Sequence, residues 1–178
     1  MSNATLIDVK REMSSSEFDA LFRAHHRLIY RTAYGITGSS EDAEDILQSI
    51  FLQLIGRKFP PDLKKNPRAY LYRAAVNASL NSIRAKRRNV QMADADQLPS
   101  SASLPEIEPH QTTRKRLLHA ISNLNAKAVE VLMLRYVHDY SDAEIAKMLG
   151  TTRGTIAVML FRSRARLKRL MRAKGVEP

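Results

Sequence analysis

The sequence predicts an all-α protein: two small helical domains joined by a flexible acidic linker, the C-terminal one a helix-turn-helix. Apolar residues recur with a helical period on both sides of residues 90–112, whereas that stretch holds three prolines, four acidic residues and no sustained apolar period. No segment shows the apolar–polar alternation of a strand. Hydrophobic residues make up 44% of the 178 residues, enough to form cores, so wholesale disorder is excluded.

The first domain is expected over residues 14–89, after an N-terminal tail of residues 1–13. Its apolar periods indicate three helices. Ser39 and Asp42 have the spacing of a capping box at the start of the second helix. Pro67 suits the first turn of the third, because proline lacks the amide hydrogen that this turn leaves unpaired. The three helices are predicted at about residues 18–29, 39–54 and 67–88.

The linker and the second domain follow, at residues 90–112 and 113–173, with a C-terminal tail at 174–178. Fully extended, the linker would span at most about 75 Å. Two domains tied in this way can sit more than one DNA turn apart, about 35 Å. Asn125 can cap the second helix of the second domain. The helices of this domain are predicted at about residues 117–124, 126–136, 142–149 and 152–171.

The most informative segment is a helix-turn-helix pattern from Ser141 to Leu170. Ser141 and Glu144 form a capping box for its first helix. Ala146 is small where two helices must cross closely, and Gly150 stands where the turn needs a left-handed residue. With an apolar residue six positions further on, this spacing matches a tight helix-turn-helix.

The second helix of that motif presents a basic face suited to the DNA major groove. Thr151 or Thr152 can cap its start. The alternative is an ordinary helical hairpin with a solvated basic face, which the agreement of turn, caps and charge disfavours. Phe161 fits the basic face and the core equally well. The residues on or beside this face are Arg153, Ala157, Phe161, Arg162, Arg164, Arg166, Lys168 and Arg169.

The net charge of +11 is segregated along the chain. Residues 61–90 carry eight basic and one acidic residue, and residues 151–178 carry the same numbers. Residues 91–112 between them carry four acidic residues and no basic one. Each basic cluster alone fits a solvated helix face, but two clusters separated by an acidic stretch indicate two contacts on one polyanion.

Several classes of function are excluded or disfavoured. The absence of cysteine rules out disulfides, thiolate metal sites and thiol nucleophiles. No glycine-rich phosphate loop and no nucleophile–base pair is present, so we predict no catalytic residue, no metal site and no cofactor. No apolar run approaches the roughly 18 residues of a membrane span, and no secretory core opens the chain. We therefore expect a non-enzymatic, cytoplasmic protein without membrane insertion.

Three ordered runs resemble a small bacterial RNA polymerase sigma factor of the extracytoplasmic-function (ECF) group. The family's core-binding helix is similar to SSEDAEDILQSIFLQL, from residue 39. Its promoter-melting helix is similar to NPRAYLYRAAVNASLNSIRAKRR, from residue 66, and its −35-binding domain to residues 124–167. The resemblance covers about residues 16–172. It implies sigma region 2 at residues 14–89 and sigma region 4 at residues 113–173.

The resemblance also implies roles for individual residues. For docking on the β′ clamp helices it implies Asp42, Asp45, Gln48 and Phe51, although helix capping explains Asp42 equally well. For recognition and melting of the −10 element it implies Lys64, Lys65, Asn66, Arg68, Arg73, Asn77, Asn81 and Arg84. For the −35 element it implies Thr152, Arg153, Ala157, Phe161, Arg162, Arg164 and Lys168.

The chain departs from the family at a few positions. Many members carry Arg or Lys where Ala157 and Met159 stand, which puts direct −35 contacts there in doubt. Asn125 replaces a usual proline and can serve the same helix as a cap. The acidic linker stands where larger sigma factors have a further region.

The leading hypothesis is a sigma factor that binds core RNA polymerase and directs initiation at promoters with −10 and −35 elements. The partners it implies are core polymerase, through the β′ clamp helices and the β flap, promoter DNA and an anti-sigma factor. The main alternative is a stand-alone helix-turn-helix regulator. A nucleoid-packaging protein is disfavoured by the single asymmetric recognition helix, and a nuclease ranks last.

Overall fold

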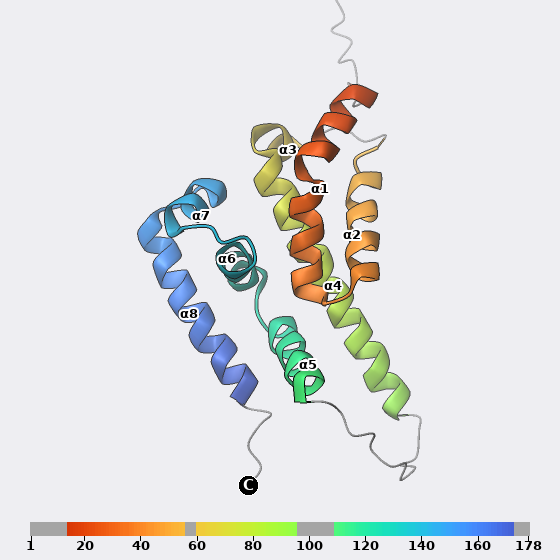
Figure 1. Ribbon diagram of the computed structural model, residues 1–178, viewed down its shortest axis with the longest axis vertical. Helices are drawn as coiled ribbons and strands as arrows, with labels where there is room; N and C mark the ends of the chain where they lie inside the picture. Colours follow the sequence, from red (N-terminus) through yellow and green to blue (C-terminus); the bar gives the residue numbers. More distant parts are fainter. Residues whose placement is uncertain (1–13, 56–59, 96–108, 173–178) are drawn as a thin grey trace, which may run out of the picture.

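In the computed structural model, residues 14–55, 60–95 and 109–172 are described, and all regular structure within them is helical (Figure 1). This confirms the predicted all-α class. We call α1–α4 the first lobe and α5–α8 the second lobe. The helices are α1 (Ser15–Thr37), α2 (Ser40–Leu52), α3 (Pro61–Lys65), α4 (Pro67–Ala95), α5 (Pro109–Ser122), α6 (Ala126–Tyr136), α7 (Asp142–Leu149) and α8 (Arg153–Arg172).

Short-range signals set the ends of the first helices. Ser14 and Glu17 form a capping box at the start of α1, and Gly38 ends that helix with φ +67°, which glycine adopts without strain. The Ser39 hydroxyl accepts a hydrogen bond from the Asp42 amide at 3.3 Å. The capping expected at Ser39 is thus present, although the Asp42 carboxylate pairs elsewhere. The short α3 was not expected from the sequence.

The core of the first lobe lies where α1, α2 and α4 meet. α1 packs along both other helices and contributes Ile29 and Ala33, which are fully buried. α2 adds Ile46, Ile50 and Phe51 from one stripe. The apolar spacing read from the sequence therefore marks the buried face of each helix.

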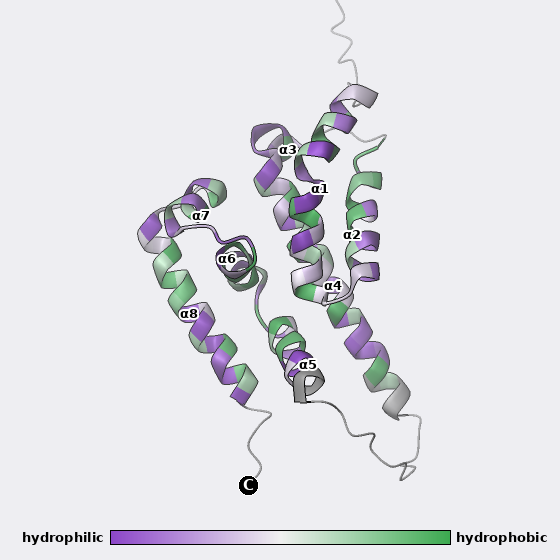
Figure 2. Cartoon of the chain, viewed as in Figure 1, coloured by the Kyte–Doolittle hydropathy of each residue, from purple (hydrophilic) through white to green (hydrophobic). Residues whose placement is uncertain are grey.

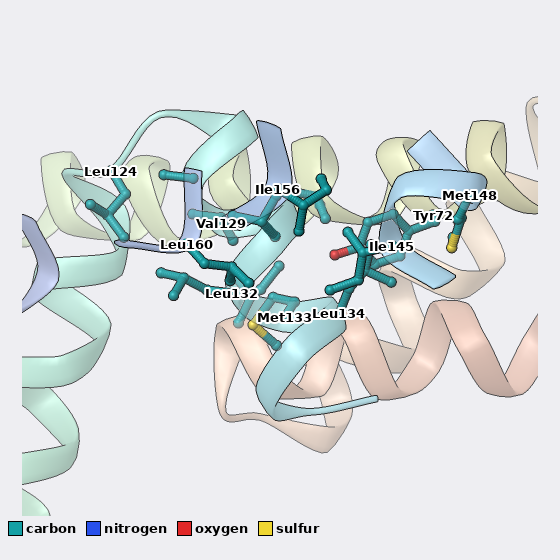
Figure 3. Close-up of a cluster of buried hydrophobic side chains, with 14 of the residues drawn as sticks. Tyr72, Leu124, Val129, Leu132, Met133, Leu134, Ile145, Met148, Ile156 and Leu160 are labelled. Atoms are coloured by element: carbon teal, nitrogen blue, oxygen red, sulfur yellow. The ribbon is translucent and has the colours of Figure 1, made fainter. Parts of the chain in front are cut away.

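A second core belongs to both lobes. The Tyr72 side chain of α4 lies among buried residues of α6 and α7, as Figure 3 shows. Its hydroxyl donates a hydrogen bond to the Glu130 carbonyl at 2.5 Å. The members contributed by the first lobe are Ile36, Ala69, Tyr72, Val76 and Leu80. The two lobes are therefore packed together, side by side along α4 (Figure 1), and not held apart as the linker allowed.

The predicted linker is shorter than expected at both ends. α4 continues through residues 90–95, and α5 already begins at Pro109, so the ends of the predicted stretch 90–112 are helical. The reason is that no proline or glycine interrupts residues 88–95, and Pro109 is compatible with a first helical turn. Of the acidic linker residues, Asp96, Glu106 and Glu108 lie outside the described residues.

Candidate nucleic-acid and polymerase interfaces

α2 presents an exposed face that is acidic along its length and apolar at its C-terminal end. Glu41, Asp45, Gln48 and Leu52 recur at i, i+4, i+7 and i+11, so they share one side of the helix, and all four are exposed. Leu52 is 65% exposed, whereas Ala43, Ile46, Ile50 and Phe51 of the same helix are buried. A face of this kind fits a partner that offers basic and apolar groups together. Leu52 was not among the residues predicted for this face.

Two residues predicted for this face lie elsewhere. Phe51 is only 3% exposed, and its ring meets the rings of Phe18 and Phe22 at centroid distances of 5.7 and 4.9 Å. It therefore supports α2 from beneath. The Asp42 carboxylate pairs with the Lys86 ammonium at 2.6 Å, and its side chain is 13% exposed. Phe51 continues the apolar stripe of α2, so its ring is buried here and is not presented on the exposed face where a partner contact was predicted.

α3 and the start of α4 gather basic and amide side chains. Lys64 and Lys65 lie exposed at the end of α3. The Asn66 side chain accepts a hydrogen bond from the Ala69 amide at 3.1 Å and so caps α4. Further along α4 an exposed stripe of Arg73, Asn77 and Asn81 recurs every four residues. Arg73 and Asn77 of this stripe line a cleft of about 500 Å³ together with Leu149 at the end of α7, and the Arg73 guanidinium donates to the Leu149 carbonyl at 3.3 Å.

The remaining residues of the predicted −10 set, Arg68 and Arg84, contact the second lobe, as Asn66 and Arg73 also do. The Arg68 guanidinium donates to the Tyr140 hydroxyl and lies 5.2 Å from the centre of that ring, a cation–π arrangement. Arg84 donates to the carbonyls of Ser122 and Leu124 at 3.0 and 2.8 Å. These partners are 38 to 72 positions away in sequence. No local pattern indicates such contacts.

The helix-turn-helix forms as predicted. Ser141 and Glu144 make both hydrogen bonds of the capping box. Gly150 has φ +69°, and the Thr151 amide donates to the Ala146 carbonyl at 2.9 Å to close the turn. Thr152 caps α8, since its hydroxyl accepts a hydrogen bond from the Thr155 amide at 3.2 Å. The cap at Asn125 of α6 is also confirmed.

α8 presents its predicted basic face to solvent. Ile156 and Leu160 hold the opposite side in the shared core. Phe161 is 69% exposed, which resolves the choice between core and surface in favour of the surface. In Figure 2 purple and green alternate along α8, in keeping with a helix that has one polar and one apolar side. The exposed members of the predicted −35 set are Thr152, Arg153, Ala157, Phe161, Arg162, Arg164 and Lys168.

A shallow apolar groove between α6 and α8 was not predicted. It has a volume of about 450 Å³, and Leu132, Tyr136, Leu167 and Met171 form its floor. Its rim is basic, with the Arg164 guanidinium 3.4 Å from the Tyr136 hydroxyl. In the sequence, Tyr136 does not indicate a groove, because it belongs to α6 and forms one only where α6 packs against α8.

Burial perturbs two titratable groups between the lobes. Burial, with the nearby Arg31 and Arg68 cations, lowers the pKa of His138 to about 4, against a smaller opposing effect of Asp139. Burial raises the pKa of Glu130, and the nearby Arg73 and Lys127 cations oppose this shift. The Arg31 and Arg68 cations that act on His138, and the Arg73 cation that acts on Glu130, come from the first lobe. Over the described ranges, no group of His, Asp and Glu could hold a metal ion, and no helix is long and apolar enough to cross a membrane.

Known protein families match this chain in two separate segments, one in each lobe. A family model described as Sigma-70 region 2 matches residues 21–89, and one described as Sigma-70, region 4 matches residues 114–167. The ECF RNA polymerase sigma factor SigM of Mycobacterium tuberculosis is 32% identical over 172 residues, covering 96% of this chain and 85% of its own length. The RNA polymerase sigma-E factor of Streptomyces antibioticus is 29% identical and covers 90% of this chain and 88% of its own.

Among solved structures, the chain is similar to the sigma factor RpoE in its complex with the anti-sigma factor NepR from Bartonella quintana. The two are 22% identical, with a TM-score of 0.49, over 88% of this chain and 98% of that one.

Proposed function

Because this chain belongs to the sigma-70 family, as an ECF sigma factor that binds core RNA polymerase and directs initiation at specific promoters, we propose how its surfaces divide that task. The observation that carries the proposal is a separation of charge. One exposed face, on α2, is acidic and ends in an exposed leucine, whereas the exposed faces of α4 and α8 are basic or amide-rich. Protein and DNA thus have different surfaces to bind.

The α2 face binds core polymerase. Asp45 and Gln48 from the expected set are exposed there, and Leu52 supplies the apolar anchor that was expected of Phe51. Leu52 and Ile55 are both exposed at the end of this acidic face, and exposed apolar side chains beside charged ones suit the edge of a protein interface. The β′ clamp helices, implied by the family resemblance, are its partner.

The α4 stripe binds the −10 element and the α8 face binds the −35 element. Guanidinium and amide groups suit phosphates and the edges of unpaired bases, and Arg73, Asn77 and Asn81 lie along a single exposed line. Extruding a base costs a few kcal/mol, which such contacts offset. On α8, Arg153 stands in the first turn, where helix-turn-helix proteins contact base edges.

The groove between α6 and α8 takes the β flap. Its apolar floor and its basic rim at Arg164 and Lys168 fit an amphipathic segment with an apolar stripe and acidic flanks. The reaction itself belongs to the polymerase, so this chain acts as a specificity subunit in the cytoplasm and not as an enzyme. An anti-sigma partner, also implied by the resemblance, would cover one of these faces.

A binding titration with purified core polymerase tests the first assignment. We expect Asp45→Arg and Leu52→Ala each to weaken binding by tenfold or more. The control Asp19→Arg makes the same change of charge on α1, where Asp19 is exposed, and should leave binding unchanged. Equal effects of Asp45→Arg and Asp19→Arg would refute the assignment. Promoter binding without any affinity for core polymerase would favour the stand-alone regulator.

A further inference from the structure

The side of α8 that points farthest from the core is apolar along its middle, although the helix is basic overall. Ile156 and Leu160 are buried, and successive residues of an α-helix are turned by about 100°, from 3.6 residues per turn. The opposite side therefore centres on residues with apolar side chains or none. Val158 is 48% exposed there and Phe161 69%. We call this the apolar line, and it consists of Gly154, Val158, Phe161 and Ala165.

Basic side chains border the apolar line on both sides, and α8 carries no acidic residue. A helix that lies in the major groove directs its outermost residues at the base edges and its flanks at the phosphates of the two strands. The charges of α8 are thus placed to hold a duplex, while apolar groups face the bases. The bordering residues are Arg162, Arg166 and Arg169 on one side and Arg153, Arg164 and Lys168 on the other.

Apolar side chains can read only one of the groups that base pairs display in the major groove. Guanine, adenine and cytosine present hydrogen-bond donors and acceptors there, whereas thymine also presents its C5-methyl group, which makes apolar contacts. The side chains of Val158 and Phe161 have no hydrogen-bonding atom, and neither has Ala157 beside the line. Covering a G·C pair with them would leave polar base groups unpaired, so the line also disfavours the wrong pair.

We propose that the apolar line of α8 reads the −35 element through the C5-methyl groups of neighbouring thymines, while the bordering arginines bind phosphate. This inference rests on the proposed function, because it takes the binding of α8 to the −35 element as given. Val158 and Phe161 are about 4.5 Å apart along the helix axis, at 1.5 Å per residue. This is close to the 3.4 Å between successive base pairs. The two side chains therefore reach neighbouring pairs.

Substitutions on the line separate base reading from phosphate binding. Val158→Ala and Phe161→Ala remove the reading groups, and both side chains are exposed, so the core stays intact. Val90→Ala is the matched control, because it makes the same truncation at a valine of α4 that is 59% exposed. Arg162→Ala removes a charge beside the line and leaves the apolar groups in place.

The experiment compares thymine with uracil, which differ only in the C5-methyl group. Duplex DNA with a randomised central segment is selected at low salt on the full chain alone, since the outer side of α8 is exposed in it. The enriched site is then synthesised with uracil in place of each thymine in turn. Fluorescence anisotropy measures the affinity of the original chain and of the four variants for every duplex.

We expect the enriched site to contain neighbouring thymines, and uracil at each of them to weaken binding about fourfold, the effect of burying one methyl group. Val158→Ala and Phe161→Ala should each abolish this preference at one thymine, and Val90→Ala should keep it at both. Arg162→Ala should weaken binding to thymine and uracil duplexes by the same factor.

Three results would overturn the proposal: selection without shared thymines, uracil without effect at every enriched position, or an unchanged thymine preference in both Val158→Ala and Phe161→Ala. Weaker binding of these two variants to core polymerase, with unchanged binding to the duplex, would assign the apolar line to a protein contact and also overturn it. Because the selection uses no polymerase, each result is separate from promoter-directed initiation, which tests the proposed function.

Discussion

Mild acid should loosen the contact between the lobes through His138. The Thr32 hydroxyl donates to the Leu28 carbonyl at 2.7 Å, so it accepts its second bond from the Nε2–H of the neutral ring. Burial, with Arg31 and Arg68 close by, lowers the pKa of His138 to about 4. When the lobes part, the ring returns to water and its pKa to the ordinary value of 6.5.

The size of the effect follows from that difference. The closed form, with the lobes packed together, favours the neutral ring, so the contribution of His138 is complete above pH 6.5 and is lost as the pH falls toward 4. At about pH 5.5 the full shift corresponds to about 1.4 kcal/mol. Because part of the ring keeps contact with water, we halve this to about 0.7 kcal/mol. The ratio of closed to open molecules should therefore fall about threefold.

Energy transfer between dyes on cysteines introduced at the exposed positions Ser49 and Ala165, followed from about pH 7.5 to about pH 5, measures this ratio. We expect His138→Gln to remove most of the pH dependence, since an amide can still donate to Thr32 but does not titrate in this range. His25→Gln is the control, because burial and Arg68 also lower the pKa of His25 outside the Thr32–His138 contact. Equal pH dependence in the original chain and in His138→Gln would refute this reasoning.

Three further perturbations test the packing and the DNA faces. Tyr72→Phe should lower the free energy of unfolding by about 1–2 kcal/mol, because the buried Glu130 carbonyl loses a donor. Urea denaturation measures this, and the effect is refuted if Tyr30→Phe costs as much. Gly150→Ala should lower the free energy of unfolding by about 1–2 kcal/mol, since φ +69° strains a residue with a Cβ even in open space. Gly154→Ala, in the first turn of α8, should raise the free energy of unfolding by up to about 1 kcal/mol. If urea denaturation shows the two substitutions changing this free energy in the same direction, backbone strain at Gly150 is not the cause. Arg164→Ala should reduce the salt dependence of duplex binding by about one unit if it contacts phosphate, or remove about 1–3 kcal/mol of discrimination at one base pair if it reads a base, and a titration showing neither change removes it from the interface.

Local structure was predictable wherever a short-range signal decides it. The helix-turn-helix followed from a capping pair at Ser141 and Glu144 and a left-handed glycine at position 150, all within ten residues, and each is present. The basic face of α8 followed from helical period in the same way. On the α2 face that we propose for polymerase binding, the sequence did not show which apolar residue is exposed. Phe51 and Leu52 are both apolar, and only the docking of α1 on α2 decides which of them is buried.

The contact between the lobes was not predictable from the sequence. Arg73 and Arg84 were read as DNA-binding residues because a guanidinium beside polar neighbours suggests phosphate. Their partners here are carbonyls at helix ends, and every residue has a carbonyl, so no side-chain pattern marks them. Tyr72 was recognised as apolar, but its role between two lobes depends on a partner 58 positions away.

If this chain delivers two DNA-binding faces to a polymerase, it changes where transcription begins, and mapping of start sites measures that change. Purified core polymerase, a library of promoter fragments and this chain are combined, and the 5′ ends of the transcripts are sequenced. We predict new start sites that share two upstream elements, and loss of these sites with Asp45→Arg but not with Asp19→Arg. A set of start sites identical with and without the chain would contradict the claim.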